Sequence, residues 1–220
     1  MPTAVIIGAS RGIGLELARQ LKERGDDVVA VCRKASDELA ELGVEVVEGV
    51  DVTNERSLAR LAGALAGRRV DVLVNSAGVL SDESLSDLDI DRIRRQFEVN
   101  SLGPLRVTAA LRGNLGDGSK VAIITSRMGS IEDNTSGGRY GYRMSKAAVN
   151  MAGRSLAHDL KEAGVAVVVL HPGFVRTDMT GHQGLIDPPE SAAGLIARID
   201  ELTLESTGTF RHTNGETIPW

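Results

Sequence analysis

The stretch Val5-Ile6-Ile7-Gly8-Ala9-Ser10-Arg11-Gly12-Ile13-Gly14 joins a short apolar run to a turn with three glycines, and an amphipathic segment follows. A buried strand, a glycine-rich turn and a helix in this order form a phosphate-binding site for a dinucleotide. The glycines allow a tight turn and a close approach of the backbone to a pyrophosphate. The helix start adds free N–H groups and a partial positive charge. We therefore predict a phosphate cradle formed by Gly8, Ser10, Arg11, Gly12, Ile13 and Gly14.

Apolar runs of strand length alternate with segments of helical period along the chain. The runs are rich in Val and Ile and do not alternate with polar residues, which is typical of strands covered on both faces. They span residues 4–7, 28–31, 44–47, 70–74, 121–125 and 165–170. The helical segments lie between them at 13–24, 55–65, 87–111 and 142–162. This order predicts an α/β fold: a single doubly wound Rossmann-type domain over residues 1–220, with a parallel sheet of about seven strands.

The overall composition excludes several classes of protein. With 42% hydrophobic and 25% charged residues, the chain is expected to be globular rather than disordered or fibrous. The formal charge of -5 offers no basic surface for nucleic acid. The histidines are scattered without ligand spacing, so no metal site is predicted. Cys32 stands alone, which excludes an intrachain disulfide, and the apolar run at 4–7 is too short for a signal peptide or a membrane span. We expect a cytoplasmic protein that does not contact the membrane.

The end of the second apolar run bears on the choice of nicotinamide cofactor. An acidic residue at this position accepts a hydrogen bond from the 2′-hydroxyl of NAD. Here the run at 28–31 ends in Cys32 and Arg33, and no carboxylate occurs before Asp37. Arg33 can pair with a 2′-phosphate, and Arg11 can approach the same group. Two solvated arginines with no phosphate to bind remain the alternative.

Tyr142 and Lys146 are four residues apart in a helical segment, so their side chains are neighbours on one face. A free phenol has a pKa of about 10, and a nearby ammonium is expected to lower it. Ser126 follows the fifth apolar run, at the sheet edge where ligands of such folds bind. Thr125 is the near alternative, although it points to the other side of the strand. Tyr140 lies about 600° of helical rotation before Lys146 and is expected to pack or to form a substrate wall.

Together, the Gly-x-x-x-Gly-x-Gly turn and the Tyr-x-x-x-Lys pair resemble the short-chain dehydrogenase/reductase family, and the resemblance covers essentially the whole chain. Ile7 and Ser76 depart from the family pattern, which has Thr and Asn there. The basic positions resemble the family's NADP-preferring pattern, so NADP(H) is the predicted cofactor. By resemblance, further cofactor-binding residues are Cys32, Arg33, Asp51, Val52, Asn75, Ala77, Gly78, Tyr142, Lys146, Pro172, Gly173, Val175 and Thr177.

The resemblance also implies catalytic roles. Tyr142 would donate a proton to the carbonyl oxygen, and Lys146 would hydrogen-bond the nicotinamide ribose. Ser126 would orient the substrate carbonyl, and Asn100 would support a water and proton relay to the lysine. An Asn within a helix could also simply mark a kink.

Three stretches narrow the resemblance to the subgroup of the C-factor signalling proteins and the sniffer-type carbonyl reductases. They are residues 12–17, 140–146 and 218–220. The short segment between Met179 and a helix expected near Glu190 predicts an open site. The implied function is NADPH-dependent reduction of an aldehyde, ketone or quinone carbonyl. The alternative is an NADP(H)-binding signalling protein of C-factor type that acts through partners. A homodimer or a homotetramer is possible in either case.

Overall fold

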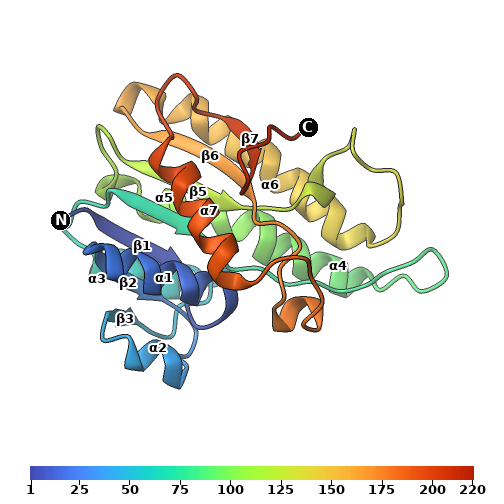
Figure 1. The fold of residues 1–220 in the computed structure, drawn as a ribbon, viewed down its shortest axis with the longest axis horizontal. Coiled ribbons are helices and arrows are strands. Elements are labelled where there is room, and N and C mark those ends of the chain that lie inside the picture. The colour runs from blue at the N-terminus through green and yellow to red at the C-terminus, as the bar shows by residue number, and fades with distance from the viewer.

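Seven parallel strands form one sheet in the order β3-β2-β1-β4-β5-β6-β7 in the computed structural model, which describes residues 1–220 (Figure 1). The strands are β1 (Thr3–Ile7), β2 (Asp27–Val31), β3 (Glu45–Val47), β4 (Val72–Asn75), β5 (Lys120–Ile124), β6 (Ala166–His171) and β7 (Thr209–His212). All pair in parallel, so their carboxyl ends meet at one edge of the sheet. The predicted doubly wound α/β fold is confirmed.

Helices cover both faces of this sheet. They are α1 (Gly12–Arg24), α2 (Asp37–Glu41), α3 (Glu55–Ala64), α4 (Ile90–Phe97), α5 (Gly103–Ala110), α6 (Tyr140–Asp159) and α7 (Pro188–Asp200). In Figure 1, α1 and α7 lie side by side in front of the sheet, and α6 lies behind it. No helix is long and apolar enough to cross a membrane.

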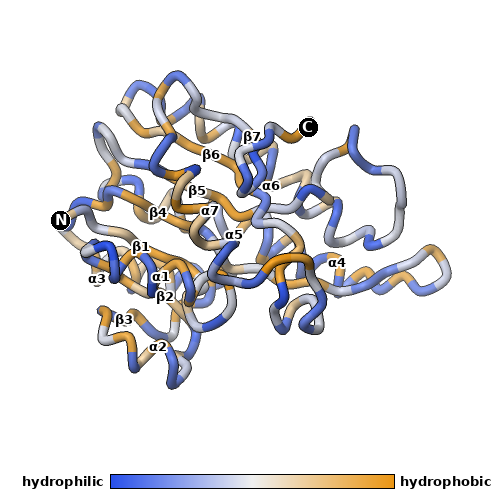
Figure 2. The backbone as a smooth tube through the Cα atoms, in the orientation of Figure 1, coloured by the Kyte–Doolittle hydropathy of each residue, from blue (hydrophilic) through white to orange (hydrophobic).

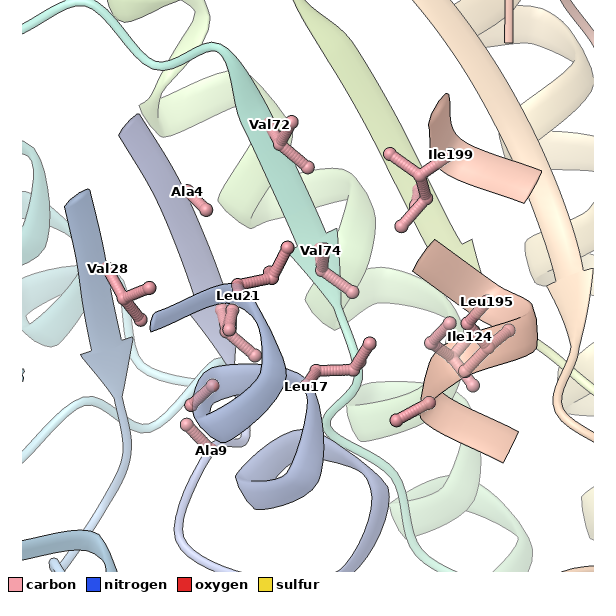
Figure 3. Packing of buried hydrophobic residues seen from close by; sticks show 14 of the residues in the cluster. Ala4, Ala9, Leu17, Leu21, Val28, Val72, Val74, Ile124, Leu195 and Ile199 are labelled. Carbon is pink, nitrogen blue, oxygen red and sulfur yellow. The ribbon is translucent and has the colours of Figure 1, made fainter. Parts of the chain in front are cut away.

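A separate hydrophobic core fills the space on each side of the sheet. On one side, Leu17 and Leu21 of α1 and Leu195 of α7 lie over the strands (Figure 3). On the other side, α3, α5 and α6 contribute side chains such as Leu61 and Val149. Both faces of the central strands are therefore buried, which explains why these strands are continuously hydrophobic in Figure 2.

The structure corrects the predicted elements at three places. The predicted helix over 87–111 begins at Ile90, because the side chain of Asp89 caps it by accepting from the Arg92 N–H at 2.9 Å. That helix is also interrupted by a π-helical turn over Glu98–Leu102 between α4 and α5. β7 was absent from the predicted runs because only Phe210 in it is fully buried.

The order of the strands in the sheet determines where a ligand can bind. β1 pairs with β2 on one side and with β4 on the other, so the helices that follow β1 and β4 lie on opposite faces. Their divergence leaves a crevice outside the carboxyl ends of the strands, which is where open α/β sheets bind ligands. All the candidate residues named from the sequence lie near this edge.

Candidate active site

A cleft of about 1150 Å³ opens at the carboxyl edge of the sheet. It runs from the start of α1 and the end of β2 to the start of α6 and the segment after β6. Of the predicted residues, it is lined by Gly8, Ser10, Arg11, Gly12, Ile13, Gly14, Cys32, Arg33, Asp51, Val52, Ala77, Gly78, Tyr142, Lys146, Pro172 and Thr177. Most of the residues predicted from the sequence therefore lie on one continuous surface.

The glycine turn closes one end of this cleft with no room for side chains. Gly8 has a φ of +86°, and a Cβ there would lie 2.7 Å from the backbone nitrogen of Ala77. A Cβ on Gly14 would lie 2.2 Å from the carbonyl oxygen of Gly8. The first turn of α1 has no acidic residue and no side-chain cap, so its N–H groups face the cleft free. This cradle fits a pyrophosphate.

The end of β2 adds positive charge to the adjacent wall. Arg33 and Lys34 both line the cleft and are exposed, and Asp37 and Glu38 line it further along the same segment. Asp51, across from them, accepts from the Thr53 N–H at 2.9 Å and from the Thr53 hydroxyl at 2.7 Å. These bonds, with Arg95 and Arg33 nearby, lower the pKa of Asp51. Lys34 and Arg95 were not singled out from the sequence, because their approach depends on how β2 and α4 meet.

Arg11 also forms an ion pair within the protein. Its guanidinium lies 3.3 Å from the carboxylate of Asp178, which stands on the opposite lip of the cleft. Both side chains are exposed, so the ion pair contributes little to stability. Arg11 is thus held across the mouth of the cleft.

The segment after β4 forms part of the floor. Ala77 contacts the glycine turn, and a Cβ on Gly78 would lie 3.5 Å from the Asn100 side chain and 3.9 Å from Lys146 Nζ. Asn75, at the end of β4, is 2% exposed, and neither atom of its side-chain amide has a hydrogen-bond partner. Unpaired buried polar atoms are rare and call for a ligand or water. Asn75, Gly173 and Val175 do not themselves line the cleft, unlike the other predicted cofactor residues.

Tyr142 and Lys146 line the cleft near the end of β5, whereas Ser126 and Asn100 stand beside it and are not among its lining residues. Ser126 lies close enough to the Tyr142 hydroxyl to lower its pKa through a side-chain hydrogen bond. Lys146 Nζ lies 5.6 Å from the centre of the Tyr142 ring and donates to the carbonyl oxygen of Ile124 at 3.0 Å. The tyrosine and lysine come from the first two turns of α6, and the serine follows β5. The predicted pairing of these groups is what the structure shows.

The protonation states differ from the expectation. Burial raises the pKa of Tyr142, and this outweighs the lowering by its hydrogen bond to Ser126 and by Arg139. The predicted lowering by Lys146 is therefore wrong for this structure. Burial also lowers the pKa of Lys146 to about 8. Both shifts favour the neutral group, so the phenol holds its proton at neutral pH.

Replacing Lys146 with Met should change how stability depends on pH. The lysine pKa falls from 10.5 to about 8 on folding, so between these values the unfolded chain binds more protons and wild-type stability rises with pH. The methionine variant lacks this titration. Its unfolding free energy relative to wild type should therefore drop by on the order of 3 kcal/mol between pH 7 and pH 10.5. Urea unfolding of both proteins at several pH values measures the difference, and a constant difference would contradict the assignment.

Asn100 reaches the site because of the π-helical turn. Its side-chain oxygen accepts from the Val79 N–H at 2.8 Å, and its amide donates to the Val79 carbonyl at 2.9 Å and to the Ser145 hydroxyl at 3.1 Å. Asn100 thereby ties the segment after β4 to α6. A π-turn widens a helix locally and is frequent at functional sites. The helix irregularity expected at Asn100 is therefore this π-helical turn, and Asn100 contacts both Val79 and Ser145 from it.

Thr125, the alternative to Ser126, lines the cleft, but its hydroxyl is engaged by α6. Its hydroxyl points to α6 and donates to the side-chain oxygen of Asn150 at 2.7 Å. The amide of Asn150 donates to the carbonyl of Gly129 at 3.3 Å. A Cβ on Gly129 would lie 2.7 Å from the Lys146 backbone. These contacts attach Thr125 and Gly129, which flank Ser126, to α6. The sequence analysis missed Asn150, because nothing in the sequence indicates that it contacts residues more than 20 positions away.

Comparisons with known proteins bear on this site. The short chain dehydrogenase family model matches residues 2–185. The 1-hydroxy-2-glutathionyl-2-methyl-3-butene dehydrogenase of Rhodococcus sp. (strain AD45) is 47% identical over 100% of both chains. The C-signal of Myxococcus xanthus is 48% identical over 69% of this chain and 93% of its own.

Among solved structures, the NADPH-bound carbonyl reductase from chicken fatty liver superposes with a TM-score of 0.90. It is 26% identical, and the match covers 100% of this chain and 99% of that one. The predicted neighbourhood of C-factor proteins and carbonyl reductases is thereby confirmed. From its family match, its full-length relative and its fold, the chain belongs to the short-chain dehydrogenase family of oxidoreductases.

Proposed function

We propose that this protein is an NADPH-dependent reductase of aldehyde, ketone or quinone carbonyls, with Tyr142 as the proton donor. The observation that carries the proposal is that Tyr142 and Lys146 lie together in the cleft, with Ser126 beside the Tyr142 hydroxyl. Bound NADPH supplies the hydride. The raised pKa of Tyr142 keeps the phenol protonated at neutral pH, which suits a general acid.

Each polar group of the site has a distinct task. Ser126 holds the Tyr142 hydroxyl and orients the carbonyl oxygen beside it. The Tyr142 hydroxyl gives up its proton as negative charge develops on that oxygen. The ammonium of Lys146 favours the resulting phenolate and would bond a ribose hydroxyl of the bound cofactor. Asn100 binds the Val79 carbonyl and the Ser145 hydroxyl. It thereby fixes the segment after β4 and the first turns of α6 on either side of Lys146.

The cleft fits NADP(H) better than NAD(H). The cradle without Cβ atoms and the free start of α1 suit the pyrophosphate. Arg33 and Lys34 suit a 2′-phosphate, and β2 is followed by Cys32 and Arg33 rather than by the acidic residue that binds a 2′-hydroxyl. A carbonyl reductase of the same fold is NADPH-bound.

The cofactor choice predicts a selective loss in Arg33→Ala. A charge-assisted hydrogen bond contributes about 1.5–3 kcal/mol, so the Kd for NADPH should rise by about 10- to 100-fold while that for NADH stays unchanged. Isothermal calorimetry with both nucleotides measures this. Arg56→Ala removes an equal charge from an exposed position outside the cleft and is the matched control. Equal weakening of both nucleotides by Arg33→Ala would count against a 2′-phosphate contact.

The substrate class follows from the open mouth of the site. Only a short segment connects the 3-10 turn Asp178–Thr180 to α7, which begins at Pro188, so little chain closes over the substrate. We propose broad acceptance of bulky carbonyls, and a panel of aldehydes, ketones and quinones followed by NADPH oxidation tests it. Strict preference for one small ketone would contradict it. The Rhodococcus relative is named a dehydrogenase of a glutathionyl alcohol. The panel should therefore also include the oxidation of such alcohols, which is the reverse reaction.

A second candidate function is signalling through partners, which the likeness to C-signal favours. In that case the protein would bind NADP(H) and act without turnover. A Tyr142→Phe protein that keeps the biological effect would support signalling, and one that loses it would support catalysis. A cytoplasmic location and a homodimer or homotetramer stay predictions, the latter measurable by light scattering.

A further inference from the structure

Glu83 is a buried carboxylate that the proposed reaction does not use. It is 3% exposed and makes no salt bridge. It lies in the segment after β4 that projects beside α4 at the right of Figure 1. A carboxylate removed from water is costly unless hydrogen bonds or opposite charge compensate it. The question is therefore what holds Glu83 there.

Three donors from three parts of the site surround this carboxylate. The Ser81 hydroxyl donates at 2.5 Å, the Gln96 side-chain amide at 3.2 and 3.3 Å, and the Gly141 N–H at 3.3 Å. Gln96 is itself 1% exposed. Each carboxylate oxygen therefore has at least two donors, which compensates much of the lost hydration.

The helix α6 supplies the opposite charge. α6 begins at Tyr140, and its N-cap residue Arg139 has a φ of 50° and no side-chain cap. The free N–H groups at the start of a helix carry a partial positive charge that favours an anion. Glu83 takes the place of the missing cap from outside the helix. The Arg139 N–H also donates to the backbone carbonyl of Glu83 at 2.9 Å, so the two segments are joined twice.

The contacts of Glu83 link the elements that carry the reacting groups. Gly141 directly precedes Tyr142, and Gln96 lies one turn before Asn100. Gly141 permits the approach because a Cβ there would lie 2.3 Å from the Gln96 amide nitrogen. We propose that Glu83 is a positioning residue, which fixes the first turn of α6 against α4 and so holds the Tyr142 hydroxyl beside Ser126. This inference rests on the proposed reductase function.

The test is Glu83→Gln, which keeps the volume but removes the charge and turns an NH₂ group toward donors. We expect kcat to fall at least about tenfold, with the Kd for NADPH within twofold of wild type. Hydrogen exchange of the peptide over 139–150 should be at least about fivefold faster. Exchange needs no turnover, so it decides the inference even if wild type reduces no carbonyl. Wild-type kcat and exchange, or an NADPH affinity that falls in parallel with kcat, would overturn it.

Two further variants separate positioning from general damage. The double variant Glu83→Gln/Gln96→Glu restores an amide–carboxylate pair, so its kcat should recover at least about fivefold over the single variant. No recovery would overturn the assigned hydrogen bonds. If Glu83→Gln does not fold, Ser81→Ala should lower kcat severalfold at constant NADPH affinity, and wild-type behaviour would refute the role. Glu16→Gln is the matched control, because Glu16 also accepts from a glutamine amide, that of Gln20 at 2.9 Å on α1.

Discussion

Replacing Tyr142 with Phe is expected to lower kcat by about 10²–10⁴-fold, the usual contribution of a positioned general acid. The substitution removes one hydroxyl, the one beside Ser126, and leaves the ring that packs near Lys146. The Kd for NADPH should stay within a few-fold of wild type, because the glycine turn and the end of β2 are unchanged. Steady-state kinetics on the best substrate of the carbonyl panel, with calorimetry for NADPH, gives both values.

Tyr140→Phe is the comparison for this experiment. Tyr140 is the only other tyrosine and begins the same helix, but it lies six residues before Lys146 and so faces away from it. Its loss should leave most of kcat intact. If the two variants kept equal activity, Tyr142 would not be the proton donor, and the site would have to protonate its product through another group.

Replacing Gly14 with Ala is expected to abolish tight NADPH binding and to destabilise the protein. The added Cβ would lie 2.2 Å from the Gly8 oxygen and 2.9 Å from the Gly8 carbonyl carbon. Both are backbone atoms of the turn, so α1 and the cradle must separate. Overpacking against rigid neighbours costs about 1–3 kcal/mol or more, and the displaced N–H groups would no longer meet a phosphate. We expect at least a 100-fold higher Kd for NADPH together with a lower Tm.

Gly63→Ala provides the matched control for this substitution. Gly63 is the penultimate residue of α3, and a Cβ there meets nothing within 4 Å. Alanine is favoured over glycine in a helix interior by about 1 kcal/mol, so Tm should rise slightly and NADPH affinity should not change. Normal NADPH binding by Gly14→Ala in the same assay would mean that the cleft binds its cofactor elsewhere.

The Tyr142, Lys146 and Glu83 experiments address one arrangement from different sides. Tyr142→Phe removes the proton donor, whereas Glu83→Gln keeps it and displaces it. Lys146→Met reports the burial that sets both protonation states. A large loss in the first, a smaller loss in the second and a pH-dependent stability change in the third would together support the proposed site.

Local features of the sequence were enough to predict much of this protein. The order of strands and helices follows from buried runs of Val and Ile, since strands covered on both faces need no polar residues. The glycine turn follows from the absence of side chains at Gly8 and Gly14, and the Tyr142–Lys146 pairing follows from helical spacing. Each of these depends on residues within a few positions of one another.

The tertiary structure alone decided the rest, because the contacts join residues far apart in the chain. Glu83 meets Gly141 across 58 positions, and no spacing rule reports such a pair. The pKa of Tyr142 depends on how much water the whole fold excludes, which reversed the effect expected from Lys146. The π-turn that brings Asn100 to Val79 likewise forms against a packed neighbour. The sequence by itself determined which groups could react, and packing determined their positions and protonation states.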